Sequence, residues 1–134
     1  MNRNGNRQKP SAKNIEFFHK VILDHSKVLK ISIVGENLYE IARTVARTPI
    51  KVYVSDIYVV SEADVFEICS ENGKLDCILV LGICNNYSNA AKQLAISKNI
   101  GLFTLKEFLG AINFTRQKFI NYEPKANNNR NNRI

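Results

Sequence analysis

Apolar residues recur along the chain with two spacings, one typical of helices and the other typical of strands. Between residues 14 and 29 they stand three or four positions apart, with Ile15 and Ile22 on one stripe, which predicts an amphipathic helix. Residues 31–34 predict a short strand, and Gly35 separates it from a second predicted helix. The apolar face of that second helix consists of Leu38, Ile41, Ala42 and Val45.

The rest of the chain alternates between strand and helix patterns. Residues 50–60 are rich in β-branched side chains that alternate with polar ones, whereas 76–81 is almost continuously apolar, as in a strand covered on both faces. Ser61 and Thr104 each precede an acid by three residues, which indicates capping boxes. The predicted elements are a strand at 50–60, a helix from Ser61, a strand at 76–81, a helix capped by Ser88 or Asn89, a strand at 100–103 and a helix from Thr104.

This alternation predicts a single α/β domain at residues 14–120. Strands joined through helices pair in parallel, so we expect a mostly parallel sheet flanked by helices on both faces. Three layers of this kind occur in Rossmann-like folds. A chain of 134 residues is about the size of one domain.

Positive charge is concentrated at the two ends of the chain. The net charge is +7, of which residues 1–13 carry +4, residues 121–134 carry +2 and residues 14–120 carry +1. Both ends are rich in Asn and poor in large apolar side chains, so we expect disordered tails. Cationic tails attract nucleic acid by releasing counterions, and the alternative is that this composition only aids solubility. The residues expected to contact nucleic acid are Arg3, Arg7, Lys9, Lys13, Lys125, Arg130 and Arg133.

The sequence further predicts a cytoplasmic protein without a metal or other cofactor. The longest apolar run, 77–84, has eight residues, fewer than the roughly 20 that span a bilayer, and the start of the chain lacks the apolar block of a signal peptide. Cys69, Cys77 and Cys84 form an odd set without a C-x-x-C pair, which favours reduced core cysteines over a zinc site.

Ligands of open α/β sheets usually bind beyond the carboxyl ends of the strands. In the predicted fold the loops 35–37, 55–56 and 82–87 follow such ends, and we expect them to be neighbours. Neither glycine of these loops belongs to a G-x-G-x-x-G or P-loop motif, so a turn requirement is the alternative to phosphate binding. The candidate ligand-binding residues are Gly35, Gly82, Asn85 and Asn86.

A string of residues in the second half gives a more specific signal. The strand at 76–81 leads into Tyr87-Ser88-Asn89-Ala90-Ala91, and Ile100-Gly101-Leu102 precedes the helix at 105–112. Over residues 50–112 this pattern resembles the C-terminal half of Mrr-type restriction endonuclease domains. The resemblance implies a restriction-endonuclease-like fold and a nucleic-acid ligand, most simply DNA.

The same resemblance indicates a degenerate active site. In that family the strand corresponding to 50–56 carries (Glu/Gln)-x-Lys, with a metal-binding Asp upstream. Here Val54 stands at the position of the acid or amide, and Asp56 stands at the position of the lysine. No Asp occurs between Lys27 and Ile50. The resemblance therefore implies a domain that binds nucleic acid without cutting it, because an acid in place of the lysine removes a cation and adds repulsion.

An active Mg²⁺-dependent DNA endonuclease is the first alternative. In that case Asp56 and either Glu40 or Glu62 would hold the metal, since hard cations take carboxylate oxygens. Lys51 or Lys74 would then stabilise charge near the scissile phosphate.

Two further alternatives are not enzymes. A Rossmann-like domain would bind a small nucleotide at Gly35 and Gly82. A structural scaffold, such as a homodimer, would associate through Tyr53, Tyr58 or the segment 114–120.

Overall fold

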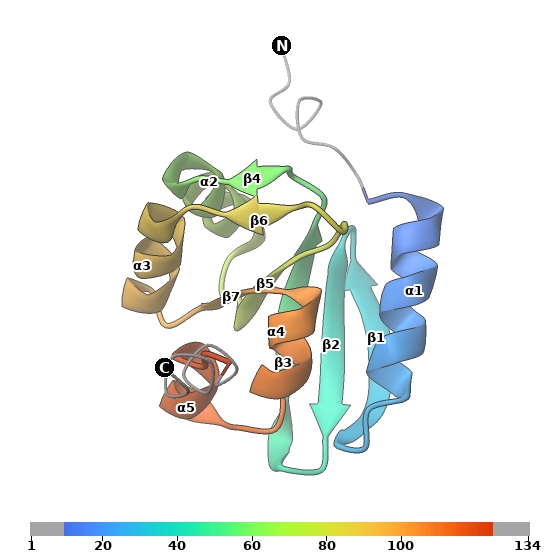
Figure 1. Ribbon diagram of the computed structural model, residues 1–134. Coiled ribbons are helices and arrows are strands. Elements are labelled where there is room, and N and C mark those ends of the chain that lie inside the picture. Colours follow the sequence, from blue (N-terminus) through green and yellow to red (C-terminus); the bar gives the residue numbers. More distant parts are fainter. Residues whose placement is uncertain (1–9, 125–134) are drawn as a thin grey trace, which may run out of the picture.

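The computed structural model describes residues 10–124, in which helices and strands follow one another along the chain (Figure 1). The helices are α1 (Ala12–Leu23), α2 (Glu62–Asn72), α3 (Asn89–Ser97), α4 (Leu105–Ala111) and α5 (Arg116–Ile120). The strands are β1 (Val28–Gly35), β2 (Leu38–Arg43), β3 (Ala46–Ser55), β4 (Val59–Val60), β5 (Cys77–Val80), β6 (Asn86–Tyr87) and β7 (Gly101–Thr104). The chain is therefore an α/β protein, as the sequence predicts.

Five of the strands form a mixed sheet in the order β1-β2-β3-β5-β7. β1, β2 and β3 pair antiparallel, whereas β3, β5 and β7 pair parallel. The prediction of a mostly parallel sheet is wrong. β1, β2 and β3 are connected by two-residue turns, at 36–37 and 44–45, and turns this short connect antiparallel strands. β4 and β6 form a separate parallel pair.

The second helix predicted from the sequence is the strand β2. Tyr39, Ile41 and Arg43 are buried and alternate with half-buried residues, as on a strand with one covered face. A charged side chain at one of the buried positions conceals this alternation in the sequence. Asn37 has a φ of 59°, which Asn tolerates better than most residues, and it lies in the tight turn between β1 and β2.

The first helix is also shorter than predicted. α1 ends at Leu23, and His25 lies in the turn before β1. The Lys27 amide donates to His25 Nδ1 at 3.1 Å, so Nε2 carries the proton and donates to the Leu109 carbonyl at 2.9 Å. This histidine thus connects the turn to α4.

The helix starts of the second half agree with the sequence. Ser61, Ser88 and Thr104 are the N-caps of α2, α3 and α4, and the first and last of them form full capping boxes. Each cap satisfies backbone amides at the point where the chain leaves a strand or loop.

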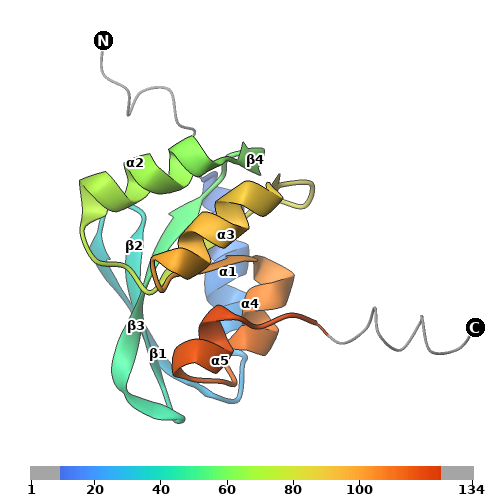
Figure 2. The same ribbon diagram turned by 90° about the vertical axis from the view of Figure 1, so that its left-hand side faces the viewer.

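Alternate residues of β3 face two clusters of buried side chains. Val52 and Val54 pack in one cluster with residues of α1, α4 and α5, whereas Tyr53 packs in the other with residues of α2 and α3. In Figure 2, α1, α4 and α5 lie together on one side of β3. Within residues 10–124, none of the helices has both the length and the apolar character needed to cross a bilayer.

Candidate functional site at the carboxyl edge of the sheet

β1, β3, β5 and β7 finish at the same end of the sheet, which we call the carboxyl edge. Ser55 of β3 pairs with Val80 of β5, which pairs with Thr104 of β7. On the other side of β3, the Val54 amide donates to the Asn37 carbonyl at 2.9 Å. The loops expected to be neighbours therefore do lie together.

Asp56 and Asn85 bind each other at the centre of this edge. Asn85 Nδ2 lies 3.1 Å from both the carbonyl and the Oδ1 of Asp56, and it donates to the Leu81 carbonyl at 2.6 Å. Asn14 of α1 adds a weaker contact, with its Nδ2 3.4 Å from Asp56 Oδ1. Asn14 is a residue that the sequence did not single out, because its partner is 42 positions away.

Gly82 is required by this arrangement. Its φ is 99°, a conformation that side-chain-bearing residues rarely adopt, and a Cβ atom would lie 2.5 Å from Asn85 Nδ2 and 3.0 Å from Asp56 Oδ1. A turn requirement thus accounts for this glycine. Gly35, by contrast, ends β1 opposite Leu38 without a positive φ.

An apolar groove of about 490 Å³ opens beside the Asp56–Asn85 pair, between α1 and α4. Phe17 and Val21 of α1 form one wall, and Leu105 and Leu109 of α4 form the other. The remaining lining residues are Asn14, Leu81, Gly82, Ile83, Asn85, Asn86, Thr104 and Lys106. Apolar walls with a few polar groups at one end are typical of small-molecule sites.

The three carboxylates proposed for Mg²⁺ do not share a face of the sheet. Glu40 lies opposite Lys51 in the β2–β3 ladder and alternates with Tyr39 and Ile41, which pack in the α1-side cluster. Asp56 contacts α1, and Glu62 is an exposed residue in the first turn of α2. Among residues 10–124, no three His, Cys, Asp or Glu side chains are grouped so that they could hold a metal.

A partly buried polar cluster behind the edge was not predicted from the sequence. Tyr87 donates its hydroxyl to the Glu107 carboxylate, with distances of 2.8 and 3.0 Å. Lys92 of α3 is 8% exposed, donates to the Leu102 carbonyl at 2.7 Å and lies over the Phe103 ring at 4.2 Å. Burial raises the pKa of Tyr87, with Glu107 adding to the effect, and burial lowers the pKa of Lys92. A helical lysine gives no sequence signal of burial, which explains the omission.

The three cysteines differ in their surroundings. Cys77 is buried, Cys69 is half-buried and Cys84 is exposed in the loop after β5, so the prediction of core cysteines is wrong for Cys84. Burial raises the pKa of the Cys77 and Cys69 thiols.

Most of the basic residues proposed to contact nucleic acid lie outside the described part of the chain. Lys13 is exposed in the first turn of α1. Those outside residues 10–124 are Arg3, Arg7, Lys9, Lys125, Arg130 and Arg133. Asn86 begins β6, and its Oδ1 accepts from the Tyr87 amide at 2.9 Å.

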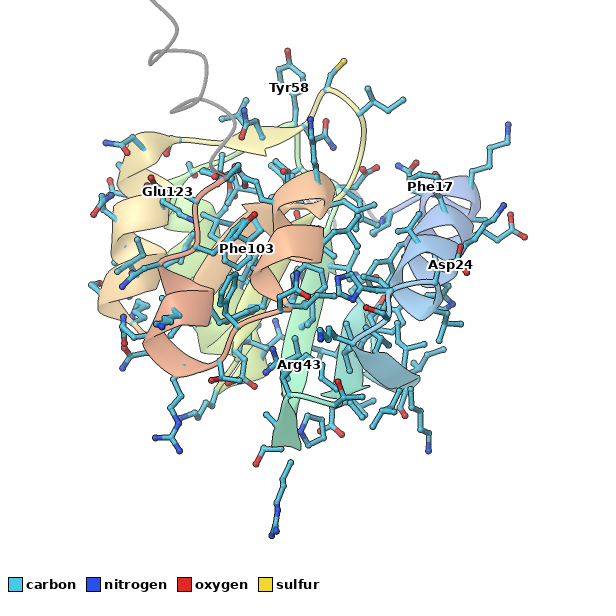
Figure 3. All side chains as sticks on the ribbon, turned by 60° about the horizontal axis from the view of Figure 1, so that its bottom comes forward. Phe17, Asp24, Arg43, Tyr58, Phe103 and Glu123 are labelled. Atoms are coloured by element: carbon cyan, nitrogen blue, oxygen red, sulfur yellow. The ribbon has the colours of Figure 1, made fainter. Side chains whose placement is uncertain are left out.

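The surfaces proposed for self-association are only partly exposed. Tyr53 is 7% exposed and belongs to the core, so its assignment to a surface is wrong. Tyr58 is 69% exposed, and Figure 3 shows it projecting from the molecule. Phe119 and Ile120 are buried, whereas Phe114 stacks on Tyr122 with 5.8 Å between the ring centroids.

In comparisons with known proteins, no family model matches the chain, and no curated protein or solved structure matches it either.

Proposed function

We propose that the chain is a nucleic-acid-binding domain of the restriction-endonuclease-like type that does not cut its ligand. The observation that carries the proposal is the separation of charge: residues 14–120 carry only +1 of the net +7. Basic ends on a nearly neutral body favour attraction to a phosphate backbone without sequence selection. We propose DNA as the nucleic acid, because DNA is the ligand that the resemblance implies.

The fold is compatible with this proposal. From β3 to α4 the order of strands and helices follows the string on which the resemblance rests. The two clusters of buried residues, one on each side of β3, support helices on both faces of the sheet and hence the three-layer arrangement.

The surroundings of Val54 and Asp56 support the absence of cleavage. Val54 is fully buried among apolar side chains, so a metal ion bound at this position would have to displace the core. Asp56 Oδ1 is already contacted by Asn85 and Asn14. An anion at this position also repels a phosphate.

DNA binding by the full chain across a salt series tests the proposal. In one variant the four basic residues of the first 13 positions are replaced by Gln, and in a matched control four exposed lysines of the body are replaced by Gln. These control lysines are Lys20, Lys30, Lys74 and Lys118. For duplex DNA the tail variant should lower the slope of log K against log salt by up to about 3.6, since each lost phosphate contact removes about 0.9. Equal slopes for the two variants would contradict the role of the ends.

Incubation of the full chain with Mg²⁺ and labelled DNA tests the absence of cleavage. We expect intact DNA for the wild type and for Asp56→Asn alike. Cleavage by the wild type that disappears in Asp56→Asn would establish the active nuclease instead.

The groove between α1 and α4 favours a second candidate function, which is the binding of a small apolar or nucleotide ligand. Its volume of about 490 Å³ is within the range of such sites, and Gly82 lines it. Nucleotides should then raise the thermal stability of the wild type but not that of Leu109→Glu, which places a negative charge on one wall and repels the phosphates. Phe66→Glu, at an exposed position of α2, is the control.

A further inference from the structure

A second concave site lies at the opposite edge of the sheet, where the turn between β2 and β3 meets the segment before α5. It is a pocket of about 530 Å³. Arg43, Arg47 and Arg116 all line it, and they are the three arginines of residues 10–124. We call this site the arginine pocket; its other lining residues are Val45, Ala46, Thr48, Pro49, Ile50, Asp76 and Thr115. Figure 3, which brings this edge forward, shows Arg43 there.

Arg43 is held in place by the protein but is not fully satisfied. Its side chain is 5% exposed, and its Nη1 donates to the Ile112 carbonyl at 3.1 Å and the Phe114 carbonyl at 2.6 Å. Its Nε is buried and has no hydrogen-bond partner among the described residues. The guanidinium carbon lies over the Phe119 ring, 5.6 Å from its centroid, so Arg43 forms an ordered and positively charged part of the pocket wall.

The charges around the pocket are unbalanced. Of the described residues that line the pocket, Asp76 is the single carboxylate, and its Oδ2 already accepts from the Lys51 amide at 2.8 Å. Arg47 and Arg116 are exposed, so their guanidinium groups are accessible from solvent. Three guanidinium groups outnumber the one carboxylate, so the charge of the lining favours an anion that carries more than one negative charge.

The backbone at Thr115 and Arg116 provides an independent observation. Arg116 has a φ of 55°, a conformation that costs a non-glycine residue of this size about 1 to 3 kcal/mol. Thr115 is the N-cap of α5, but its side chain makes no capping hydrogen bond. A strained arginine and an uncommitted hydroxyl therefore border the same pocket.

A purely structural role does not account for the whole site. The two bonds of Arg43 to carbonyls connect β2 to residues 112–114, and such bonds occur in many cores. They do not explain why two exposed arginines, Arg47 and Arg116, line the same pocket. A guanidinium fork matches the oxygens of a phosphate group bidentately, and a phosphate offers more acceptors than a carboxylate.

We propose that the arginine pocket binds a phosphate group, supplied either by a small phosphomonoester or by a nucleic-acid backbone. The site lies at the opposite edge from the groove between α1 and α4, and it does not depend on the proposed function of the basic ends.

Titration of the full-length protein with inorganic phosphate, followed by calorimetry and by thermal unfolding, tests the proposal. We expect saturable binding that weakens about tenfold or more in Arg47→Gln/Arg116→Gln, because two charge-assisted contacts are lost. The matched control is Lys20→Gln/Lys30→Gln, which removes the same charge from exposed positions and should bind phosphate like the wild type. Arg47→Lys/Arg116→Lys should fall between the two, since lysine keeps the charge but not the fork.

Two DNA oligonucleotides, one with and one without a 5′-phosphate, distinguish the sources of the phosphate group. If Arg47→Gln/Arg116→Gln binds the oligonucleotide without a 5′-phosphate more weakly than the lysine control does, the result would support a nucleic-acid backbone phosphate. Unchanged DNA binding with lost phosphate binding would support a small phosphomonoester. Equal phosphate binding by the glutamine variant and the wild type, or tighter binding of acetate than of phosphate, would overturn the proposal. If the tail variant alone loses DNA binding and still binds phosphate like the wild type, the arginine pocket is a phosphate site independent of the basic ends.

Discussion

The two edges of the sheet use polar side chains in opposite ways. At the carboxyl edge, Asn85 donates to acceptors of Asp56 and Leu81, so the polar groups there satisfy one another. At the opposite edge, Arg43 keeps an unpaired buried Nε beside two exposed arginines. The rule for strand ends draws attention to the first edge, whereas the three arginines of residues 10–124 lie at the second.

The largest effect should come from Arg43→Met, which keeps the bulk of the side chain but removes its donors. The carbonyls of Ile112 and Phe114 would lose their partner, and we expect a loss of about 2 to 4 kcal/mol in the free energy of unfolding. Urea denaturation measures it. Arg47→Met, exposed in the same pocket, should stay within about 0.5 kcal/mol of the wild type. A loss of similar size in both variants would show that Arg43 is not the structural anchor of this edge.

At the carboxyl edge, Asn85→Asp replaces the donor that faces Asp56 by a carboxylate. We expect a loss of about 1 to 3 kcal/mol at pH 7, because two like charges meet and a hydrogen bond is lost. The repulsion raises the pKa of the introduced carboxyl in the folded state, so stability should recover as the pH falls and that group binds a proton. Asn86→Asp, at the exposed next position, is the control. A loss independent of pH would show that repulsion by Asp56 is not its cause.

Tyr87→Phe removes the hydrogen bond between Tyr87 and Glu107, which lies behind the same edge. Its hydroxyl donates to the Glu107 carboxylate, so the loss should be about 1.5 kcal/mol at neutral pH. Burial and Glu107 raise the pKa of Tyr87 from its usual 10.0. The contribution of the hydroxyl should therefore be complete below pH 10 and decline as the pH rises further, because the unfolded chain loses its phenolic proton first.

The measurement is the difference in unfolding free energy between wild type and Tyr87→Phe from pH 8 to 11. It should be constant up to about pH 10 and then shrink. Tyr58→Phe, at a largely exposed position, should show no comparable difference. A difference that grows above pH 10 would contradict the direction of the pKa shift.

The second half of the fold was predictable from local signals, whereas in the first half α1 and β1 were predicted but β2 and the antiparallel pairing were not. The strand 77–80 is wholly buried and apolar, and Ser61 and Thr104 cap the helices they precede in sequence. In the first half, Arg43 occupies a buried position of β2, and the edge strand β1 leaves Leu29 and Ile33 exposed. The buried charge breaks the alternation from which β2 would be recognised, and the exposed apolar residues conceal that β1 is an edge strand.

The candidate sites divide in a similar way. The general rule for strand ends led to Asp56, Gly82 and Asn85, which do lie together. The arginine pocket depends instead on a contact between residues 43 and 112, which are 69 positions apart. No local pattern connects such residues, and only the antiparallel meander, which the sequence did not reveal, brings them together.

The smallest expected effect has the opposite sign and concerns the strain at the arginine pocket. Arg116→Gly should stabilise the protein by up to about 1 kcal/mol, because glycine adopts a φ of 55° without steric cost. Lys118→Gly in the same short helix should instead destabilise it by about 1 kcal/mol, since its backbone is helical and glycine has a low helix propensity. Thermal unfolding of the two variants measures both effects. If Arg116→Gly gains stability while phosphate binding weakens, the strained arginine is present for the ligand at the expense of the fold. If it loses stability as Lys118→Gly does, the conformation of Arg116 is a favourable part of α5, and the contrast between the two edges rests on Arg43 and Arg47 alone.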